Sequence, residues 1–143
     1  MRKKIPAELR REVTERAKGC CEYCRTDSEF SDSPFDMEHV IPFSQNGKTE
    51  ADNLALSCHG CNLYKSNKIE SFDAVSGKFS RLFNPRKDVW NDHFAWAKNY
   101  TLIIGLTPVG RAAVEALKLN RKGLMNRRRA VYISGELPPE DFS

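Results

Sequence analysis

Hydrophobic positions recur at the spacing of a helix near the start of the chain. Leu9, Val13 and Ala17 lie four residues apart within residues 6–18, a proline occupies the first turn of this segment, and a glycine follows it. Proline suits the first turn because its missing N–H has no helical partner there, and glycine commonly follows a helix end. The pattern therefore predicts a helix over residues 6–18.

The next hydrophobic segments are short and are separated by turn residues. Residues 35–41 have the composition of a strand that Pro42 ends, and residues 44–49 form a polar turn region. Residues 54–56 predict a second short strand, and residues 61–68 predict a helix. The expected order is strand, loop, strand and helix.

The last part of the chain combines one hairpin pattern with two helical patterns. Residues 93–97 and 101–105 predict a hairpin. Thr107 and Pro108 are a typical cap and first residue of a helix with one apolar stripe. A second helix is expected from residue 120 or 121 to about residue 133, with Arg128 near its packed side.

Five cysteines add a stronger constraint. Cys21 and Cys24 form one Cys-x2-Cys pair, and Cys58 and Cys61 form another. This spacing is typical of a structural Zn2+ site in which each pair supplies two thiolates. Disulfides are the competing interpretation, but the count is odd and the N-terminus has no apolar signal region, which favours a reducing, cytoplasmic location. Cys20 also lies within ligand spacing of Cys24, and we expect it to be a small buried residue instead.

Composition sets broader limits. The 143 residues, of which 40% are hydrophobic, suffice for one compact domain over 1–143, with a core at about 20–70, an extension at about 71–135 and a loose tail at 136–143. The net charge is +4, and the basic residues cluster near both ends. Such clusters suit a polyanion, although basic helices also simply solvate their outer faces. No apolar run is long enough to span a membrane.

Glu38-His39, Asn53 and Asn62 lie around the two cysteine pairs. Their intervals resemble the motif of the HNH nuclease family, and the four paired cysteines stand where zinc-binding members place theirs. The resemblance covers about residues 21–68 and implies a ββα-metal core. With the helix predicted before this core and the hairpin and helices after it, the expected fold class is α+β.

The resemblance also assigns roles to individual residues. It implies that Glu38 and Asn62 bind a catalytic divalent cation, that His39 is the general base, and that Asn53 orients His39 or its loop. Asn62 replaces the histidine that ends the usual motif, but asparagine there is familiar from the HNH domains of CRISPR effector nucleases. Carboxylate and amide oxygens favour Mg2+ or Mn2+.

Physical chemistry supports these roles without the family. His39 directly follows a carboxylate, and an imidazole with an ordinary pKa of about 6.5 can take a proton from water. Lys65 lies one turn after Asn62 on the predicted helix, so we expect it to meet a phosphate beside the cation. His59 is expected to face solvent or a phosphate. Neighbours in a regular strand face opposite sides, so the strand must bulge or end near Glu38 for both groups to meet one phosphate.

The tail of the chain is similar to that of small bacterial stand-alone HNH proteins. The similarity rests on Asn84-Pro85-Arg86, Trp90, His93-Phe94, residues 106–111 and Leu119-Asn120-Arg121. It implies no particular substrate. We expect the tail to pack on the zinc-bound core and extend a basic surface that faces DNA, with Arg127 and Arg129 as nucleic-acid contacts.

The expected function is a metal-dependent endonuclease that hydrolyses phosphodiester bonds of double-stranded DNA. One alternative is a zinc-stabilised nucleic-acid-binding module without cleavage. Another is a nuclease subunit that is active only with a partner protein, as in a defence or mobile-element system. Retention of the base and both cation ligands favours the enzyme, because a binding module does not need them together.

Overall fold

The structure is a computed structural model that describes residues 4–136. The predicted tail, 136–143, lies outside the described residues apart from Glu136, as do the basic residues Arg2 and Lys3. The described chain contains five α-helices, six strands and three 3-10 helices, so the predicted α+β class is confirmed. Within residues 4–136, no helix is both long and apolar enough to cross a membrane.

The N-terminal helix α1 spans Ala7–Arg16 and begins directly after Pro6, as predicted. Its apolar side buries Val13 and packs on strand β2. Arg16, at the last turn, donates to the backbone oxygens of Ala51 at 2.9 Å and Leu54 at 2.7 Å. The helix is therefore fastened to the strand by one apolar and one charged contact.

The central element is an antiparallel pair of strands followed by a helix. β1 spans Asp36–His39, β2 spans Leu54–Ser57, and helix α2 spans His59–Lys65. Three 3-10 helices lie in the loops before β1 and between the two strands, at Ser28–Phe30, Phe43–Gln45 and Ala51–Asn53. All residues of β2 are buried, since the strand lies between α1 and the rest of the core. This is the predicted strand, loop, strand and helix.

Three short elements after α2 are absent from the sequence-based prediction. β3 at Glu70–Asp73 and β4 at Lys78–Arg81 form a second hairpin, and a one-turn helix, α3, spans Trp90–His93. The hairpin leaves Phe72 and Phe79 largely exposed and in ring contact with each other. Its missed signal is the alternation of Phe72 with polar neighbours, ahead of a turn with Gly77 at positive φ.

The third hairpin and the last two helices agree with the prediction. β5 spans Phe94–Ala97 and pairs with β6 at Leu102–Gly105, while α4 spans Pro108–Leu117 and α5 spans Lys122–Ile133. The Thr107 hydroxyl accepts a hydrogen bond from the Gly110 N–H at 3.0 Å, so it caps α4.

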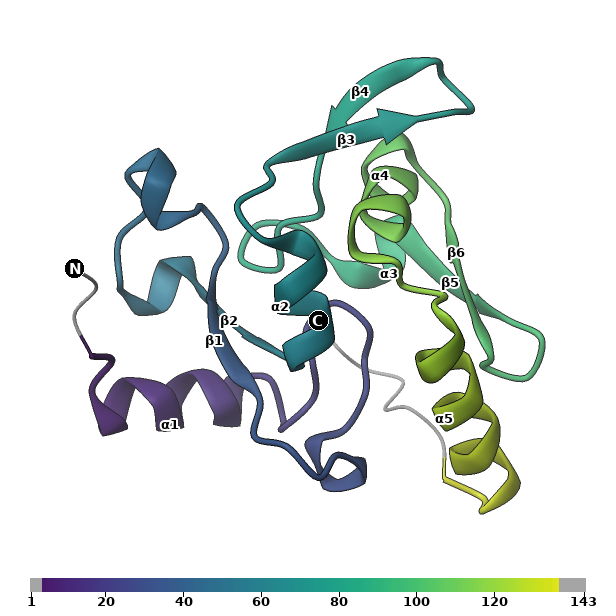
Figure 1. The fold of residues 1–143 in the computed structure, drawn as a ribbon, viewed down its shortest axis with the longest axis horizontal. Coiled ribbons are helices and arrows are strands. Elements are labelled where there is room, and N and C mark those ends of the chain that lie inside the picture. Colours follow the sequence, from purple (N-terminus) through teal and green to yellow (C-terminus); the bar gives the residue numbers. More distant parts are fainter. Residues whose placement is uncertain (1–3, 137–143) are drawn as a thin grey trace.

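The elements before and after α2 share one buried cluster. α2 lies between the β1–β2 hairpin and α4, and the β3–β4 hairpin projects beyond α4 (Figure 1). Trp90 joins the halves, because its indole N–H donates to the backbone oxygen of Tyr23 at 3.1 Å and its ring packs on Phe94 and Trp96. The extension after residue 70 therefore packs on the core.

Candidate active site

The two cysteine pairs come together as a single buried cluster. The sulfur atoms of Cys21, Cys24, Cys58 and Cys61 all lie within 4.8 Å of one another. The backbone N–H groups of Cys24 and Cys61 donate to the first sulfur of their own pair, at 3.5 Å and 3.4 Å. Among the described residues no disulfide joins any cysteine.

The surroundings of this cluster suit a metal with thiolate ligands. The guanidinium of Arg121 lies 3.6 Å from the sulfur atoms of both Cys58 and Cys61 and stacks on the ring of Tyr64. A fixed cation balances negative charge on thiolates, whereas neutral thiols would gain little from it. Cys20 lies outside the cluster: it is buried, its thiol is 3.7 Å from the backbone oxygen of Lys18, and burial raises its pKa to about 11.

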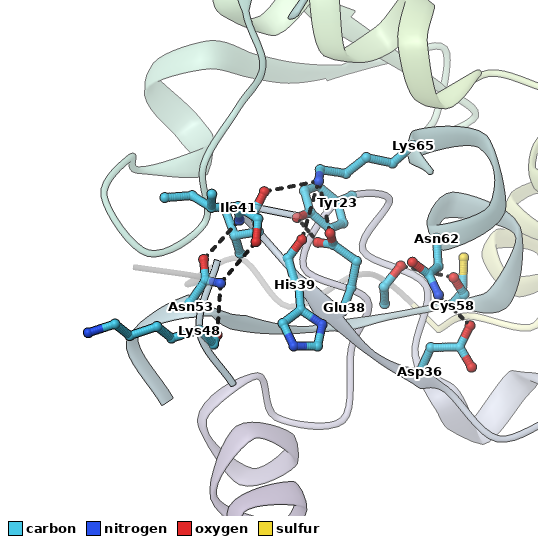
Figure 2. A network of polar contacts seen from close by, with 12 residues as sticks. Tyr23, Asp36, Glu38, His39, Ile41, Lys48, Asn53, Cys58, Asn62 and Lys65 are labelled. Carbon is cyan, nitrogen blue, oxygen red and sulfur yellow. Dashed lines mark hydrogen bonds and ion pairs between the residues drawn. The ribbon is translucent and has the colours of Figure 1, made fainter. Parts of the chain in front are cut away.

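Glu38 and Lys65 form a buried ion pair between β1 and α2 (Figure 2). Lys65 Nζ donates to Glu38 Oε2 at 2.8 Å and to the backbone oxygen of Val40 at 3.1 Å, and the Tyr23 hydroxyl donates to Glu38 Oε1. Both charged side chains are only 2% exposed. Burial raises the pKa of Glu38, and the adjacent ammonium opposes that rise.

This arrangement corrects the prediction for Lys65. A lysine on the same helix face as Asn62 was expected to meet a phosphate, but its ammonium is buried and is held by the Glu38 carboxylate and backbone oxygens. An unpaired carboxylate inside the core is costly, and Lys65 is the group that neutralises it. The sequence placed the residue on the correct face and assigned it the wrong partner.

His39 faces the other side of β1, and the strand ends at this residue. Its Nε2 atom is 2.8 Å from the Thr49 hydroxyl, and the edge of its ring approaches Phe43. The sequence required the strand to bulge or end near Glu38, and the strand does end one residue later, at His39. This early end leaves Glu38 in the core and turns His39 toward the loop that follows.

Asn53 holds that loop in place. Its Oδ1 atom accepts from the Ile41 N–H at 2.8 Å, and its Nδ2 atom donates to the oxygens of Ile41 at 3.0 Å and Lys48 at 2.9 Å. The Asn53 backbone oxygen also accepts from the Val40 N–H. The asparagine is therefore bonded to the backbone of the loop that follows His39.

Asn62, on α2, contacts a different carboxylate from the one expected. Its Nδ2 atom donates to Asp36 Oδ2 at 3.0 Å, and His59 Nδ1 lies 2.9 Å from the same oxygen (Figure 2). His59 faces solvent, as predicted, with its side chain 70% exposed. The carboxylate of Glu38 is instead held by Tyr23 and Lys65, and it makes no hydrogen bond with Asn62.

A groove of about 470 Å3 lies between the end of β1 and helix α2. Its walls come from the end of β1, the loop after it and the exposed face of α2. The lining residues that carry chemistry are Glu38, His39, Ser44, His59, Asn62 and Asn67. The groove therefore brings an imidazole and a metal-ligand type amide to one solvent-accessible space.

The family comparison covers the same region. Residues 21–68 match the family model described as HNH endonuclease. We refer to this matched segment as the HNH domain. The match includes both cysteine pairs, β1, β2 and α2, and it agrees with the resemblance read from the sequence. No curated protein and no solved structure matched the chain significantly.

Arg127 and Arg129, the other two residues predicted to contact nucleic acid, lie outside the HNH domain, on α5. Arg129 is exposed and donates to Asn126 at 3.1 Å. Arg127 is half-buried beside a small pocket lined by aromatic residues of the extension. Arg128 is buried as predicted, and its guanidinium donates to the backbone oxygens of Leu119 and Thr101 and lies over Trp96. Backbone carbonyls thus supply the partners that the sequence left open.

Sequence reasoning missed Asp36 as the partner of Asn62 and His59. Its signal was present, because residues two apart in a strand share a face, and Asp36 therefore lies on the same side of β1 as Glu38. Arg121 was also missed as a neighbour of the cysteines. It had no local signal, since the contact joins residues sixty positions apart in the chain.

Proposed function

We propose that this protein is a metal-dependent endonuclease that hydrolyses phosphodiester bonds in DNA. The observation that carries the proposal is the groove in which His39, from the end of β1, and Asn62, from α2, face the same space within an HNH domain. The four buried cysteines form its structural zinc site, which fixes β2 and α2 relative to the first cysteine pair.

His39 is the general base in this proposal. The contact between its Nε2 atom and the Thr49 hydroxyl orients the ring, and the three hydrogen bonds of Asn53 fix the loop behind it. A neutral imidazole held in this way can take a proton from a water that attacks phosphorus. Its position at the strand end allows that without moving the buried Glu38–Lys65 pair.

Asn62 is the residue of α2 that would hold a divalent cation, for which Mg2+ and Mn2+ are the candidates. Such an ion, when bound, stabilises negative charge that develops on the phosphate and the leaving group. The amide of Asn62 lies on the groove wall and contacts a carboxylate, so the chain provides oxygen ligands of the type these ions prefer.

Free basic side chains next to the groove support nucleic acid as the substrate. A second groove of about 510 Å3 runs along α1 and shares Met37 with the first. It is lined by Arg10 and Arg11, which are exposed and make no ion pair with any described residue. A backbone that crosses from one groove to the other would place phosphates against these two arginines. Arg127 and Arg129 remain proposed contacts on α5.

Plasmid cleavage tests this function. Supercoiled DNA is incubated with the zinc-loaded protein and Mg2+ or Mn2+, and the wild type is compared with His39→Ala. We expect metal-dependent nicking or cutting that falls at least about a hundredfold in the variant, the lower range for loss of a general base. Zinc content and the unfolding midpoint of both proteins serve as controls for folding. DNA binding without metal-dependent cleavage above the His39→Ala background would favour the binding-module alternative instead.

A further inference from the structure

Both carboxylate oxygens of Glu38 are already engaged by donors. Oε2 accepts from Lys65, Oε1 accepts from Tyr23, and the side chain is almost fully buried. A divalent cation at Glu38 would stand beside the ammonium of Lys65, which carries the same sign of charge. Displacing Lys65 would leave an unpaired ammonium in the core, which proteins avoid. The carboxylate that the sequence assigned to the catalytic cation therefore serves the fold.

Asp36 offers a carboxylate on the same face of β1 without that obstacle. Its side chain is 31% exposed, and its Oδ2 atom lies 2.9 Å from His59 Nδ1 and 3.0 Å from Asn62 Nδ2. No lysine or arginine within residues 4–136 makes an ion pair with it. Its two partners both line the groove that contains His39.

These three groups can change from mutual hydrogen bonding to ligation. Rotation of the Asn62 amide exchanges its nitrogen and oxygen, so that Oδ1 faces the carboxylate side. A neutral His59 presents a nitrogen lone pair from Nδ1. Asp36, Asn62 and His59 then supply two oxygens and one nitrogen, and water or a phosphate oxygen can complete the coordination of the ion.

We propose that Asp36, rather than Glu38, is the carboxylate ligand of the divalent cation, and that Asn62 and His59 complete the ligand set of the protein. The role of this ion in cleavage rests on the proposed nuclease function, whereas its binding does not. An imidazole ligand favours Mn2+ over Mg2+, since nitrogen binds the transition ion better than the harder alkaline-earth ion. His59→Ala should therefore narrow the difference in affinity between the two metals.

Mn2+ titration of the zinc-loaded protein, followed by electron paramagnetic resonance of the free ion, tests the site directly. We expect Asp36→Asn to weaken Mn2+ binding by roughly tenfold or more, in line with losses on disturbing metal sites. Asp32→Asn, which removes an exposed carboxylate from the loop before β1, is the matched control and should bind as the wild type does. Glu38→Gln should keep Mn2+ binding and lower the unfolding midpoint.

Because Glu38→Gln can fail to fold, the double variant Glu38→Gln with Lys65→Met removes both charges and provides a second test of Mn2+ binding. The inference is overturned if Asp36→Asn binds Mn2+ as the wild type does, if the wild type binds no Mn2+, or if the folded Glu38 variants lose binding. DNA cleavage measured on the same proteins separates the two proposals. Asp36-dependent Mn2+ binding without DNA cleavage supports the cation site and contradicts the nuclease function. Cleavage that needs Glu38 and not Asp36 supports the nuclease function and contradicts the cation site.

Discussion

Lys65 donates its ammonium to the Glu38 carboxylate at 2.8 Å in a region where both side chains are 2% exposed. The pair joins β1 to α2, and the Val40 oxygen provides the ammonium with another acceptor. Burying two charges is costly, so such a pair contributes less to stability than its short distance suggests. Removing one partner is a different matter, because the other charge then stays in the core.

We predict that Lys65→Ala lowers the free energy of unfolding by about 3–5 kcal/mol, the usual cost of an uncompensated buried charge. Urea denaturation of the zinc-loaded protein measures this loss. The double variant Glu38→Gln with Lys65→Met should recover most of it, since no charge remains unpaired. A single variant within about 1 kcal/mol of the wild type would show that Lys65 is not needed to neutralise Glu38, since a loss of that size is typical of single substitutions in general.

Zinc retention should separate the roles of the paired cysteines and of His39. Cys58→Ala leaves three thiolates, so we expect it to lower the bound zinc and destabilise the fold, because a structural ion contributes to folding directly. His39→Ala should keep the zinc and the unfolding midpoint while cleavage is lost. Zinc is measured by plasma emission after gel filtration. Equal loss of zinc in both variants would contradict the division into a structural and a reactive site.

Asn53→Asp tests the loop that carries His39. The substitution keeps the size of the side chain and the bond from the Ile41 N–H, but it places an oxygen against the carbonyl groups of Ile41 and Lys48. We expect a loss of about 1–3 kcal/mol in the free energy of unfolding, the cost of unsatisfied buried polar groups. The cleavage rate should fall by more than the loss of folded protein explains, because the loop next to His39 loses its support. Unchanged kinetics in a destabilised variant would limit Asn53 to a purely structural role.

Salt dependence of DNA binding tests the groove along α1. The double variant Arg10→Ala with Arg11→Ala should lower the slope of log affinity against log salt by about two units, because each arginine displaces roughly one counterion. Lys78→Ala with Lys87→Ala removes the same charge from exposed positions elsewhere and should change the slope less. Equal slopes for the two double variants would show that the α1 groove has no special part in binding.

The pH dependence of stability should reveal the ion pair between Asp73 and Arg111. Arg111 donates to both Asp73 oxygens, at 2.8 Å and 3.0 Å, and these bonds lower the pKa of the Asp73 carboxyl well below its ordinary value. A carboxyl whose pKa is lower in the folded state stabilises the protein above its unfolded pKa of about 3.9. That contribution is lost as the pH falls toward the folded pKa.

Urea midpoints between pH 6 and pH 3 measure this loss as the difference between the wild type and Asp73→Asn. The wild type should be the more stable protein at pH 6, and the difference should shrink below about pH 4. Acid also protonates the zinc ligands, but it does so in both proteins, so the comparison removes that effect. A difference that stays constant over this range would assign the stability of Asp73 to its backbone contacts with the turn at Val75 and Ser76.

Local signals predicted most of the fold. Thr107 and Pro108 predicted α4, the proline before Ala7 predicted α1, and the cysteine spacing predicted the four-cysteine cluster, because each of these depends on a few adjacent residues. The β3–β4 hairpin was missed since its strands are short and leave Phe72 and Phe79 exposed. A hydrophobic pattern predicts a strand with one buried face, whereas the face of this hairpin that carries Phe72 and Phe79 is largely exposed.

The partners of charged side chains were harder to predict than the elements that carry them. The sequence located the helix face of Lys65 correctly. Whether Lys65 contacts a phosphate or Glu38, however, depends on how closely α2 packs on β1. The contacts of Asp36 with Asn62 and His59 likewise depend on how β1 and α2 pack. Periodicity gives the direction of a side chain within its own element, and the distance to another element is a property of the packed chain.

Gly60 lies where the second cysteine pair meets the extension. A Cβ atom at this position would lie 2.5 Å from Nη2 of Arg121, so a side chain here would push the guanidinium off the sulfur atoms. Arg121 also donates to the backbone oxygens of Leu117 and Lys118, at the end of α4. The corner between α4 and α5 is thus held to the sulfurs by charge. Loss of the metal, followed by protonation of the thiolates, would remove the anion that anchors this corner, so the second half of the protein should respond to whether the first half carries zinc.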